Sequence, residues 1–258
     1  MTGLIEEVRV DQIVTMGVVV TGGGSGIGRA CARDLAASGR PVAVWDVDDD
    51  AAIEAVAGLD VPAIGIGVDV TDPAAVEAAI EQTRDALPSI GGLVHSAGIV
   101  SIEPIGAVDF ANFQRVLDVN LVSFARITQL LLPDLRAAGP GAAIVGVASI
   151  DALVGNAVIP GYCASKAGLL GLIRSMAATL GPEGIRVNGV CPGFIDTPML
   201  APGLAIAEVR ESFESAAALR RVGQPEDIAG VVRFLLSADA GFVTGQAIVA
   251  DGGVLAVH

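Results

Sequence analysis

The chain has 258 residues, 52% of them apolar, so it can bury one large core or two modest ones. Its formal net charge of −14 argues against nucleic acid and anionic membrane surfaces as partners, because both would be repelled over most of the protein surface. No composition shift, charge block or Pro/Ser-rich linker marks a boundary, which favours a single domain over residues 1–258.

The cysteines and histidines indicate neither a metal site nor a disulfide framework. Cys31, Cys163 and Cys191 lack ligand spacing, and His95 and His258 lie far apart. We therefore expect reduced thiols and no metal. No basic segment leads into an apolar run, and no apolar stretch reaches membrane-spanning length. These features predict a cytoplasmic enzyme or binding protein with no membrane partner.

Short apolar, β-branched runs alternate with amphipathic ones along the chain. Runs of this length indicate strands buried on both faces, as in a parallel sheet. The candidates are residues 17–21, 41–46, 63–70, 92–97, 142–149, 185–192 and 245–252. Helical patterns lie between them, clearest after Asp72, an N-cap followed by proline. The alternation predicts a doubly wound α/β Rossmann fold, a seven-stranded parallel sheet with helices on both faces and ligands at the strands' C-terminal ends.

The first strand runs into the glycine-rich segment TGGGSGIG, residues 21–28. Gly22, Gly26 and Gly28 lie between a strand and a helix. In that context, backbone N–H groups and the helix N-terminus would face a pyrophosphate, and the absent side chains would let it approach. The alternative is a turn whose glycines serve only tight strand-to-helix packing.

Asp46 closes the second strand, where a carboxylate can accept hydrogen bonds from the adenosine ribose hydroxyls of a dinucleotide. The same carboxylate would repel a 2′-phosphate, and neither Ser25 nor Val47 supplies a cation to hold one. These residues predict NAD rather than NADP as the cofactor. The alternative is an N-cap or a solvated acid in the acidic run 46–50.

Nearly the whole chain resembles the classical short-chain dehydrogenases/reductases. The motifs that carry the resemblance occur in family order: TGGGSGIG at 21–28, VDV at 68–70, VNL at 119–121, Ser149, YCASK at 162–166 and CPGFIDTPM at 191–199. Ser149 precedes Tyr162 by the family's usual interval. The resemblance implies hydride transfer between a nicotinamide cofactor and an alcohol or ketone carbon.

Tyr162 and Lys166 are the only tyrosine and the only lysine of the chain, and their i, i+4 spacing places them on one helix face. A phenol with a pKa near 10 is a poor base at neutral pH, but a cation about 5 Å away would lower that pKa by about two units at an effective dielectric of about 20. Tyr162 could then act as general base on an alcohol or general acid toward a ketone. The alternatives are a core aromatic and a solvated lysine.

The resemblance assigns further roles in the reaction. Lys166 would also hydrogen-bond the nicotinamide ribose, Ser149 the substrate oxygen, and Asn120 would support a water that relays protons to Lys166. The alternatives are a strand-end hydroxyl that caps a loop for Ser149, and helix polarity or a kink for Asn120. The predicted catalytic residues are thus Asn120, Ser149, Tyr162 and Lys166.

The resemblance also implies a set of cofactor contacts. Asp69 would contact the adenine or merely cap a turn, Ser96 stands where the family has asparagine, and residues 192–197 would contact the nicotinamide amide or form an ordinary loop. The Ser96 change affects a supporting hydrogen bond rather than the chemistry. The predicted contacts are Gly22, Ser25, Gly26, Ile27, Gly28, Asp46, Val47, Asp69, Val70, Ser96, Ala97, Gly98, Tyr162, Lys166, Pro192, Gly193, Ile195 and Thr197.

The substrate side is predicted to be apolar. Its walls would be the segment after Val100, the loop after Ser149 and a lid at about 195–220, whereas the N-terminal extension at about 1–15 has no clear role. The predicted lining is Ile102, Ile150, Leu153, Val154, Val158, Met199, Leu200, Leu204 and Phe213. This lining favours an uncharged hydrophobic secondary alcohol or ketone, with ordinary core packing as the alternative for each residue.

Two other functions stay open. The C-terminal segment also resembles 3-oxoacyl-(acyl-carrier-protein) reductases, and an arginine patch that included Arg126 would favour an acyl thioester, although the acidic chain and predicted NAD use oppose it. A non-catalytic NAD-binding sensor is the other alternative. Such proteins commonly lose the tyrosine or the lysine, and both are present here.

Two long helical patterns, 113–135 and 162–180, are apolar on more than one side. Such helices need cover from another element or subunit, and Gly168 and Gly171 would permit close approach. The resemblance implies a homotetramer that uses these two helices as its main interface.

Overall fold

The computed structural model describes residues 15–256, and within that range seven parallel strands form one sheet in the order β3-β2-β1-β4-β5-β6-β7. The strands are β1 (Gly17–Thr21), β2 (Val42–Asp46), β3 (Ala63–Gly67), β4 (Ile90–His95), β5 (Ala143–Val147), β6 (Arg186–Pro192) and β7 (Ala247–Ala250). The chain moves outward from β1 to β3 and returns to β4 on the other side of β1. Ligands of such sheets bind where the strand order reverses, at the C-terminal ends.

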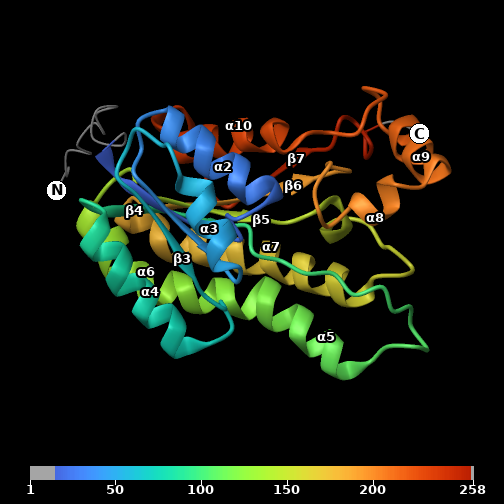
Figure 1. Cartoon of the computed structure of the whole chain (residues 1–258), viewed down its shortest axis with the longest axis horizontal. Helices are drawn as coiled ribbons and strands as arrows, with labels where there is room; N and C mark the ends of the chain where they lie inside the picture. The colour runs from blue at the N-terminus through green and yellow to red at the C-terminus, as the bar shows by residue number, and fades with distance from the viewer. Residues whose placement is uncertain (1–14, 257–258) are drawn as a thin grey trace.

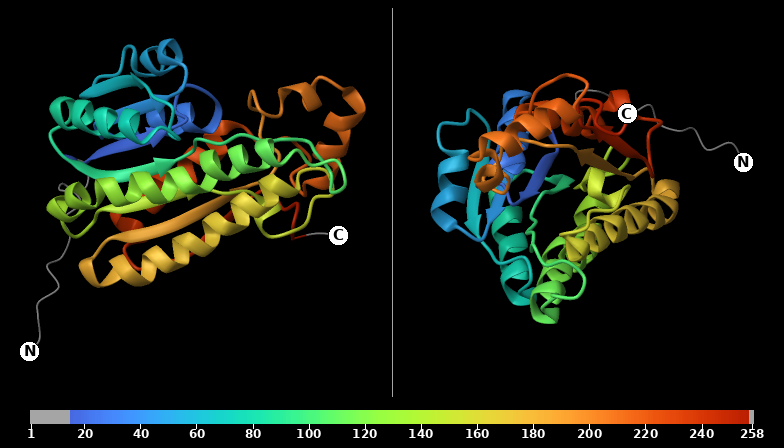
Figure 2. Two further views of the ribbon diagram at one scale, coloured as in Figure 1. Left: turned by 90° about the horizontal axis from the view of Figure 1, so that it is seen from below. Right: turned by 90° about the vertical axis from the view of Figure 1, so that its right-hand side faces the viewer.

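Helices cover both faces of the sheet, as Figures 1 and 2 show. The helices are α2 (Gly26–Ala37), α3 (Asp49–Val56), α4 (Pro73–Ala86), α5 (Phe110–Leu117), α6 (Ser123–Ala138), α7 (Pro160–Leu180), α8 (Ala201–Leu204), α9 (Ala207–Ala216) and α10 (Pro225–Leu236). One hydrophobic cluster joins α2, α3 and α10 to the sheet, and a second joins α4, α6 and α7 to its opposite face. The predicted single-domain Rossmann fold is confirmed.

The helical stretch Phe110–Ala138 consists of α5, a π-helical turn η1 (Asp118–Val122) and α6. With a mean hydropathy of 1.3, it is the one helix in residues 15–256 long and apolar enough to cross a membrane, whereas we expected no such stretch from the sequence. Its side chains Phe124, Ile127 and Leu131 are fully buried in the cluster that covers the sheet. A core helix passes the same test of length and composition, but only 39% of the apolar window is buried, so this packing accounts for part of its apolar character.

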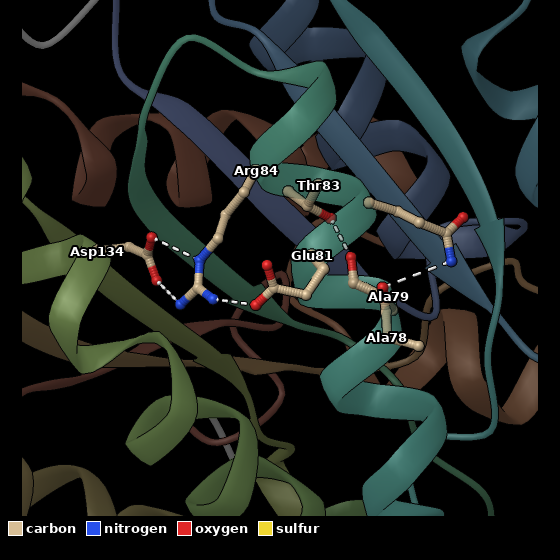
Figure 3. A network of polar contacts seen from close by, with 7 residues as sticks. Ala78, Ala79, Glu81, Thr83, Arg84 and Asp134 are labelled. Carbon is tan, nitrogen blue, oxygen red and sulfur yellow. Dashed lines mark hydrogen bonds and ion pairs between the residues drawn. The ribbon is translucent and has the colours of Figure 1, made fainter.

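One arginine, Arg84, links two helices of this face, as Figure 3 shows. Arg84 of α4 donates through Nε and Nη2 to the two carboxylate oxygens of Asp134 in α6, at 3.0 and 2.7 Å, and its Nη1 pairs with Glu81. Bidentate arginine–carboxylate pairs fix orientation as well as distance. The pair raises the pKa of Arg84 above its usual value. It therefore holds α6, which continues the turn that carries Asn120.

Candidate active site

The glycine-rich loop packs tightly where β1 meets α2. A Cβ atom added at Gly28 would lie 2.1 Å from the carbonyl oxygen of Gly22, so the first turn of α2 rests directly on the end of the strand. Gly22 and Gly26 have φ angles of +63° and +49°, in the left-handed region that glycine tolerates. Ser25 is the N-cap of α2, is exposed and makes no side-chain capping hydrogen bond. The packing role is thus real, and the loop also leaves the N-terminus of α2 open to an anion.

Asp46 is anchored by the backbone at the end of β2. Its Oδ2 accepts a hydrogen bond from the Gly24 N–H at 2.8 Å, and its Oδ1 accepts one from the Asp48 N–H at 3.1 Å. The N-cap of α3 is Asp48, whose side chain accepts from Ala51, so the capping alternative for Asp46 is wrong. Val47 is 76% exposed beside it. The carboxylate therefore has a fixed position next to the glycine-rich loop.

Ser149, Tyr162 and Lys166 meet beyond the end of β5. Ser149 lies two residues after that strand and is 7% exposed. Its hydroxyl is near enough to the phenol of Tyr162, in the first turn of α7, to act on the pKa of that phenol. Lys166 is one helical turn later, with its Nζ 5.6 Å from the centroid of the tyrosine ring. Lys166 Nζ also donates to the Val147 carbonyl oxygen at 2.7 Å. The three predicted residues therefore lie together at the C-terminal end of β5.

Asn120 lies in the π-helical turn η1 and is fully buried. Its Oδ1 accepts from the Ile99 N–H at 2.8 Å, while its Nδ2 donates to the Ile99 carbonyl at 3.0 Å and to Ser165 Oγ at 2.9 Å. The helix is interrupted here by the π-helical turn, a feature that is frequent at functional sites, and the kink that we considered as an alternative stays a prediction. Asn120 thus clamps the segment after β4 to α7.

Comparison with known proteins decides the family. A family model described as enoyl-(acyl carrier protein) reductase matches residues 22–255. Cis-4-hydroxycyclohexanecarboxylate dehydrogenase of Sinomonas cyclohexanicum is 40% identical over 93% of this chain and 96% of its own. The cyclohexanol dehydrogenase of Acinetobacter sp. (strain SE19) is 35% identical over 96% of this chain and 98% of its own. A short-chain type dehydrogenase/reductase from Mycobacterium marinum has a solved structure with a TM-score of 0.88 at 32% identity, covering 96% of this chain and 100% of that one.

The chain belongs to the classical short-chain dehydrogenases/reductases. It is therefore an oxidoreductase of CH–OH groups that uses a nicotinamide cofactor. The described residues fit such a cofactor, because the glycine-rich loop leads into the N-terminus of α2, where the N-cap Ser25 makes no side-chain capping hydrogen bond, and the Asp46 carboxylate is held beside it. The cofactor would supply the hydride acceptor or donor when bound.

Two further segments that the family resemblance assigned to the cofactor lie beside this loop. Ser96 and Ala97 donate their N–H groups to the backbone and side-chain oxygens of Thr21 at the end of β1, both at 3.2 Å. A Cβ atom at Gly98 would lie 3.4 Å from Lys166 Nζ. The segment after β4 thus joins the end of β1 to the catalytic lysine.

The segment after β6 returns to the glycine-rich loop. Pro192 ends β6, Ile195 is buried and pairs with Gly223, and a Cβ atom at Gly193 would lie 2.7 Å from Asp251 Cβ. A Cβ atom at Gly26 would lie 3.2 Å from Thr197 Cγ2, so the two loops are in contact. The segment is therefore fixed against the predicted cofactor site rather than being a free Pro/Gly loop.

The remaining predicted contacts, Asp69, Val70 and Ile27, are less informative. Asp69 Oδ1 accepts hydrogen bonds from the Thr71 N–H and hydroxyl at 2.9 and 2.7 Å, which lower the pKa of Asp69. The turn-capping alternative for Asp69 is therefore correct, and the adenine contact stays a prediction. Val70 is buried, and Ile27 is half-buried against the core cluster around α2.

The pKa of Tyr162 differs from the expectation drawn from its spacing to Lys166. Burial, reinforced by the charges of Asp151, Cys163 and Cys191, raises that pKa to about 12, while the hydrogen bond with Ser149 lowers it. Burial also lowers the pKa of Lys166 to about 8. The expected lowering of the tyrosine pKa is wrong for the protein's own groups, because the lysine ammonium is directed at the Val147 carbonyl and desolvation of the phenolate dominates.

The sequence did not identify His95 as a residue of the site. His95 is fully buried at the end of β4, with Nδ1 2.9 Å from Thr21 Oγ1 and Nε2 3.3 Å from Ser123 Oγ. Ser123 Oγ donates to the Val119 carbonyl, so it accepts from Nε2–H, and Nδ1 accepts from Thr21. The neutral imidazole thus joins the glycine-rich loop to the turn of Asn120. Its position directly before Ser96 was the only sequence signal.

Asp151 is the second residue that the sequence did not identify. It is half-buried in the 3₁₀ turn η2 (Ile150–Ala152). Ser149 Oγ accepts from the Asp151 N–H at 3.1 Å and donates to Asp151 Oδ2 at 3.2 Å, while Asn156 Nδ2 donates to Oδ1 at 3.2 Å. A carboxylate therefore contacts the predicted catalytic serine.

Most of the predicted apolar lining is exposed on segments next to the site. The segment after Val100 and the loop after Ser149 are joined by a hydrogen bond from the Glu103 N–H to the Val158 carbonyl at 2.9 Å. In the lid, Phe213 of α9 stacks on Phe194 with ring centroids 4.0 Å apart. The exposed members of the lining are Ile102, Leu153, Val154, Val158 and Met199, whereas Ile150 and Leu204 are buried, in keeping with the packing alternative for these two.

Metal chemistry finds no support in residues 15–256, where no group of three or more His, Cys, Asp and Glu side chains could hold an ion. Cys31 and Cys191 are buried, Cys163 is partly buried, and all three are free thiols. Burial raises the pKa of Cys31 to about 12. The thiol of Cys31 is therefore a packing group.

Proposed function

We propose that the protein is an NAD-dependent dehydrogenase/reductase that transfers a hydride between NAD and an uncharged hydrophobic secondary alcohol or ketone. The observation that carries this proposal is the meeting of Ser149, Tyr162, Lys166 and Asn120 beyond β5, next to a glycine-rich loop that holds Asp46.

In oxidation, the C–H bond of the carbinol carbon breaks as hydride leaves, and its O–H proton passes to Tyr162 Oη. In reduction, Tyr162 donates that proton to the ketone oxygen. Ser149 hydrogen-bonds the same oxygen and positions it beside the phenol. Lys166 provides a positive charge near the ring, and Asn120 holds the surrounding backbone. The raised pKa keeps Tyr162 protonated at neutral pH, the state needed for ketone reduction, and oxidation should accelerate as pH rises.

The preference for NAD over NADP rests on Asp46. Two backbone N–H groups hold its carboxylate beside the loop, and no arginine or lysine of the described residues forms an ion pair with it. A 2′-phosphate there would meet a fixed negative charge. Comparing kcat/KM for NAD and NADP tests the preference, and a clear advantage for NADP would refute it.

The hydrophobic substrate rests on the exposed apolar side chains beside Ser149. Binding in an apolar site favours an uncharged alcohol whose body contacts these groups. The residues around 195–220 would then act as a lid over it. By family resemblance we also infer a cytoplasmic homotetramer.

Two observations favour the acyl thioester alternative. One is the description of the matching family model, and the other is the (3R)-3-hydroxyacyl-CoA dehydrogenase of Rattus norvegicus, which is 36% identical over 92% of this chain and 96% of its own. Arg126 does not add support for this alternative, because its Nη1 donates to the Thr71 carbonyl at 3.0 Å, in the loop before α4. A 3-oxoacyl thioester belongs in the substrate panel for this reason. The sensor alternative requires NAD binding without turnover.

The deciding experiment follows NADH fluorescence with NAD and a panel of aliphatic, cyclic, aryl and steroidal secondary alcohols. We expect activity with one class, and loss of turnover in Tyr162→Phe with NAD binding retained. Turnover by Tyr162→Phe would refute the assigned acid–base residue. If the protein binds NAD but turns over none of the alcohols, a thioester substrate is favoured. If the thioester is not turned over either, the sensor alternative is favoured.

A further inference from the structure

Asp151 introduces a negative charge beside Ser149, whereas the predicted substrate lining is apolar. Its carboxylate contacts Ser149 Oγ, and both Ser149 and Asp151 are near enough to the Tyr162 phenol to act on its pKa. No arginine or lysine within residues 15–256 forms an ion pair with Asp151. In the described part of the chain, the only side chain that donates to it besides Ser149 is the amide of Asn156.

The hydrogen bonds leave acceptor capacity on this carboxylate. Each carboxylate oxygen can accept about two hydrogen bonds. Oδ1 accepts one from Asn156, and Oδ2 accepts one from the Ser149 hydroxyl. Ser149 has only one proton, and a substrate oxygen bound at Ser149 would compete for it. Once Ser149 turns to the substrate, Oδ2 can accept from a new donor close to the reacting oxygen.

From this geometry we propose that Asp151 selects neutral substrates that carry a second hydroxyl next to the reacting carbinol, that is vicinal diols or the matching hydroxyketones, and excludes substrates that carry a carboxylate. The inference rests on the proposed function, since it assigns the substrate class of the same site. The second hydroxyl would donate to Oδ2 and replace the proton that Ser149 gives to the reacting oxygen.

The exclusion of anions follows from the same contact. A substrate carboxylate near Ser149 would face Asp151 without an intervening cation, and like charges brought together out of water are strongly unfavourable. The lysine of the site does not compensate, because Lys166 Nζ is bound to the Val147 carbonyl and only 3% of Lys166 is exposed.

The test compares three alcohols that share one ring: cyclohexanol, 1,2-cyclohexanediol and cis-4-hydroxycyclohexanecarboxylate. We expect the wild-type protein with NAD to show kcat/KM for the diol about tenfold or more above cyclohexanol, because a site built to bond a hydroxyl rejects the analogue that lacks it. The hydroxy acid should be the poorest substrate. Equal efficiency for all three would overturn the proposal.

Two variants separate charge from hydrogen bonding. Asp151→Asn removes the charge but keeps an acceptor oxygen, so the ratio of hydroxy acid to cyclohexanol efficiency should rise about tenfold, with much of the diol preference retained. Asp151→Ala removes the acceptor, so the diol preference should be lost. Ratios within one variant cancel any general loss of activity. Ratios that stay at the wild-type value in both variants would overturn the proposal.

Asp239→Asn is the matched control. Ser237 Oγ accepts from the Asp239 N–H at 3.2 Å, as Ser149 Oγ accepts from the Asp151 N–H. Arg186 at the start of β6 donates to the Ser237 carbonyl, so this second Ser-x-Asp motif lies at the N-terminal ends of the strands, away from the site. The three substrate ratios should be those of the wild type. A change in Asp239→Asn equal to that in Asp151→Asn would show a nonspecific effect and contradict the proposal.

A pH profile adds a readout that a structural role would not move. The charged and titratable groups facing Tyr162 are Asp151, Cys163 and Cys191, with Lys166 beside the ring. Because the Asp151 charge opposes ionisation of the phenol, Asp151→Asn should shift the rise of oxidation rate toward lower pH by about half a unit or more. An unmoved profile would count against the contact with the reacting groups.

Failure of the proposal and failure of the proposed function give different results. Turnover of cyclohexanol without a diol preference would reject the role of Asp151 alone. If no alcohol is turned over, calorimetry of the NAD-loaded protein with the diol and the hydroxy acid still tests Asp151. Diol binding that Asp151→Ala abolishes would support it, and equal binding of the hydroxy acid would overturn it.

Discussion

At the scale of single residues, the site depends on groups whose importance comes from tertiary contacts. Tyr162, Lys166 and Ser149 could be identified from the sequence because their spacing is local. The contacts of His95 with Thr21 and Ser123, by contrast, join residues far apart in the chain. The sign of the shift in the Tyr162 pKa was likewise unpredictable from spacing, since burial decides it.

His95 gives the first prediction, which concerns stability and pH. Burial, with the nearby charge of Lys166, lowers the pKa of His95 to about 3. An unfolded histidine titrates near 6.5, so between pH 6.5 and about 3 the unfolded chain binds one more proton than the folded one. Stability from this group is complete above pH 6.5 and is lost as pH falls. The free energy of unfolding should drop by about 1.5 kcal/mol between pH 6.5 and 5 from this residue alone.

Denaturant unfolding of the wild type and His95→Asn at pH 7.5, 6.5, 5.75 and 5 measures this difference. The variant should be less stable at pH 7.5, because it loses buried contacts, but should show a shallower decline below pH 6.5. Parallel declines would contradict the assignment. NMR gives an independent check, because the imidazole C–H resonances of His95 should not titrate between pH 7.5 and 5 in the folded protein.

At the scale of elements, the sequence predicted the strands well but left open what covers each helix. Apolar runs bounded by turn residues defined all seven strands of the described range to within a few residues. Gly168 was expected to permit close approach of another element or subunit, and the close neighbour is Leu121 of the same chain, whose Cδ2 would lie 2.8 Å from a Cβ atom at Gly168. Periodicity locates a helix face, but only the fold shows which neighbour occupies it.

The packing of α2 on β1 gives the second prediction. In Gly28→Ala the new methyl group would lie 2.1 Å from the carbonyl oxygen of Gly22, a backbone atom that cannot move away as a flexible side chain could. We expect α2 to shift, with a loss of several kcal/mol of stability and of NAD affinity. In the control Gly230→Ala, nothing lies within 4 Å of the added atom in α10, and stability should rise by up to about 1 kcal/mol. Thermal unfolding measures the stability of both variants, and calorimetry measures their NAD affinity. Wild-type stability and affinity in Gly28→Ala would refute the close contact.

At the scale of the whole molecule, the predicted assembly depends on the outer face of α7. The structure contains the long helices on which the tetramer prediction was based. The two glycines of α7 differ in their surroundings. Gly168 is covered by Leu121, whereas a Cβ atom at Gly171 would meet nothing within 4 Å. The N-terminal extension predicted at about 1–15 lies almost entirely outside the described residues.

Gly171→Gln therefore tests the predicted homotetramer. Within one chain the longer side chain has open space, so the fold and the thermal midpoint should be kept. Against a second copy packed on α7, the same side chain would occupy the space that glycine leaves, and the assembly should fall apart to smaller species. Ala78→Gln, an exposed position of α4 outside the predicted interface, is the control and should remain tetrameric. Light scattering at micromolar concentration measures the mass, and a wild-type monomer would refute the tetramer, because cover for the outer face of α7 would then not be needed.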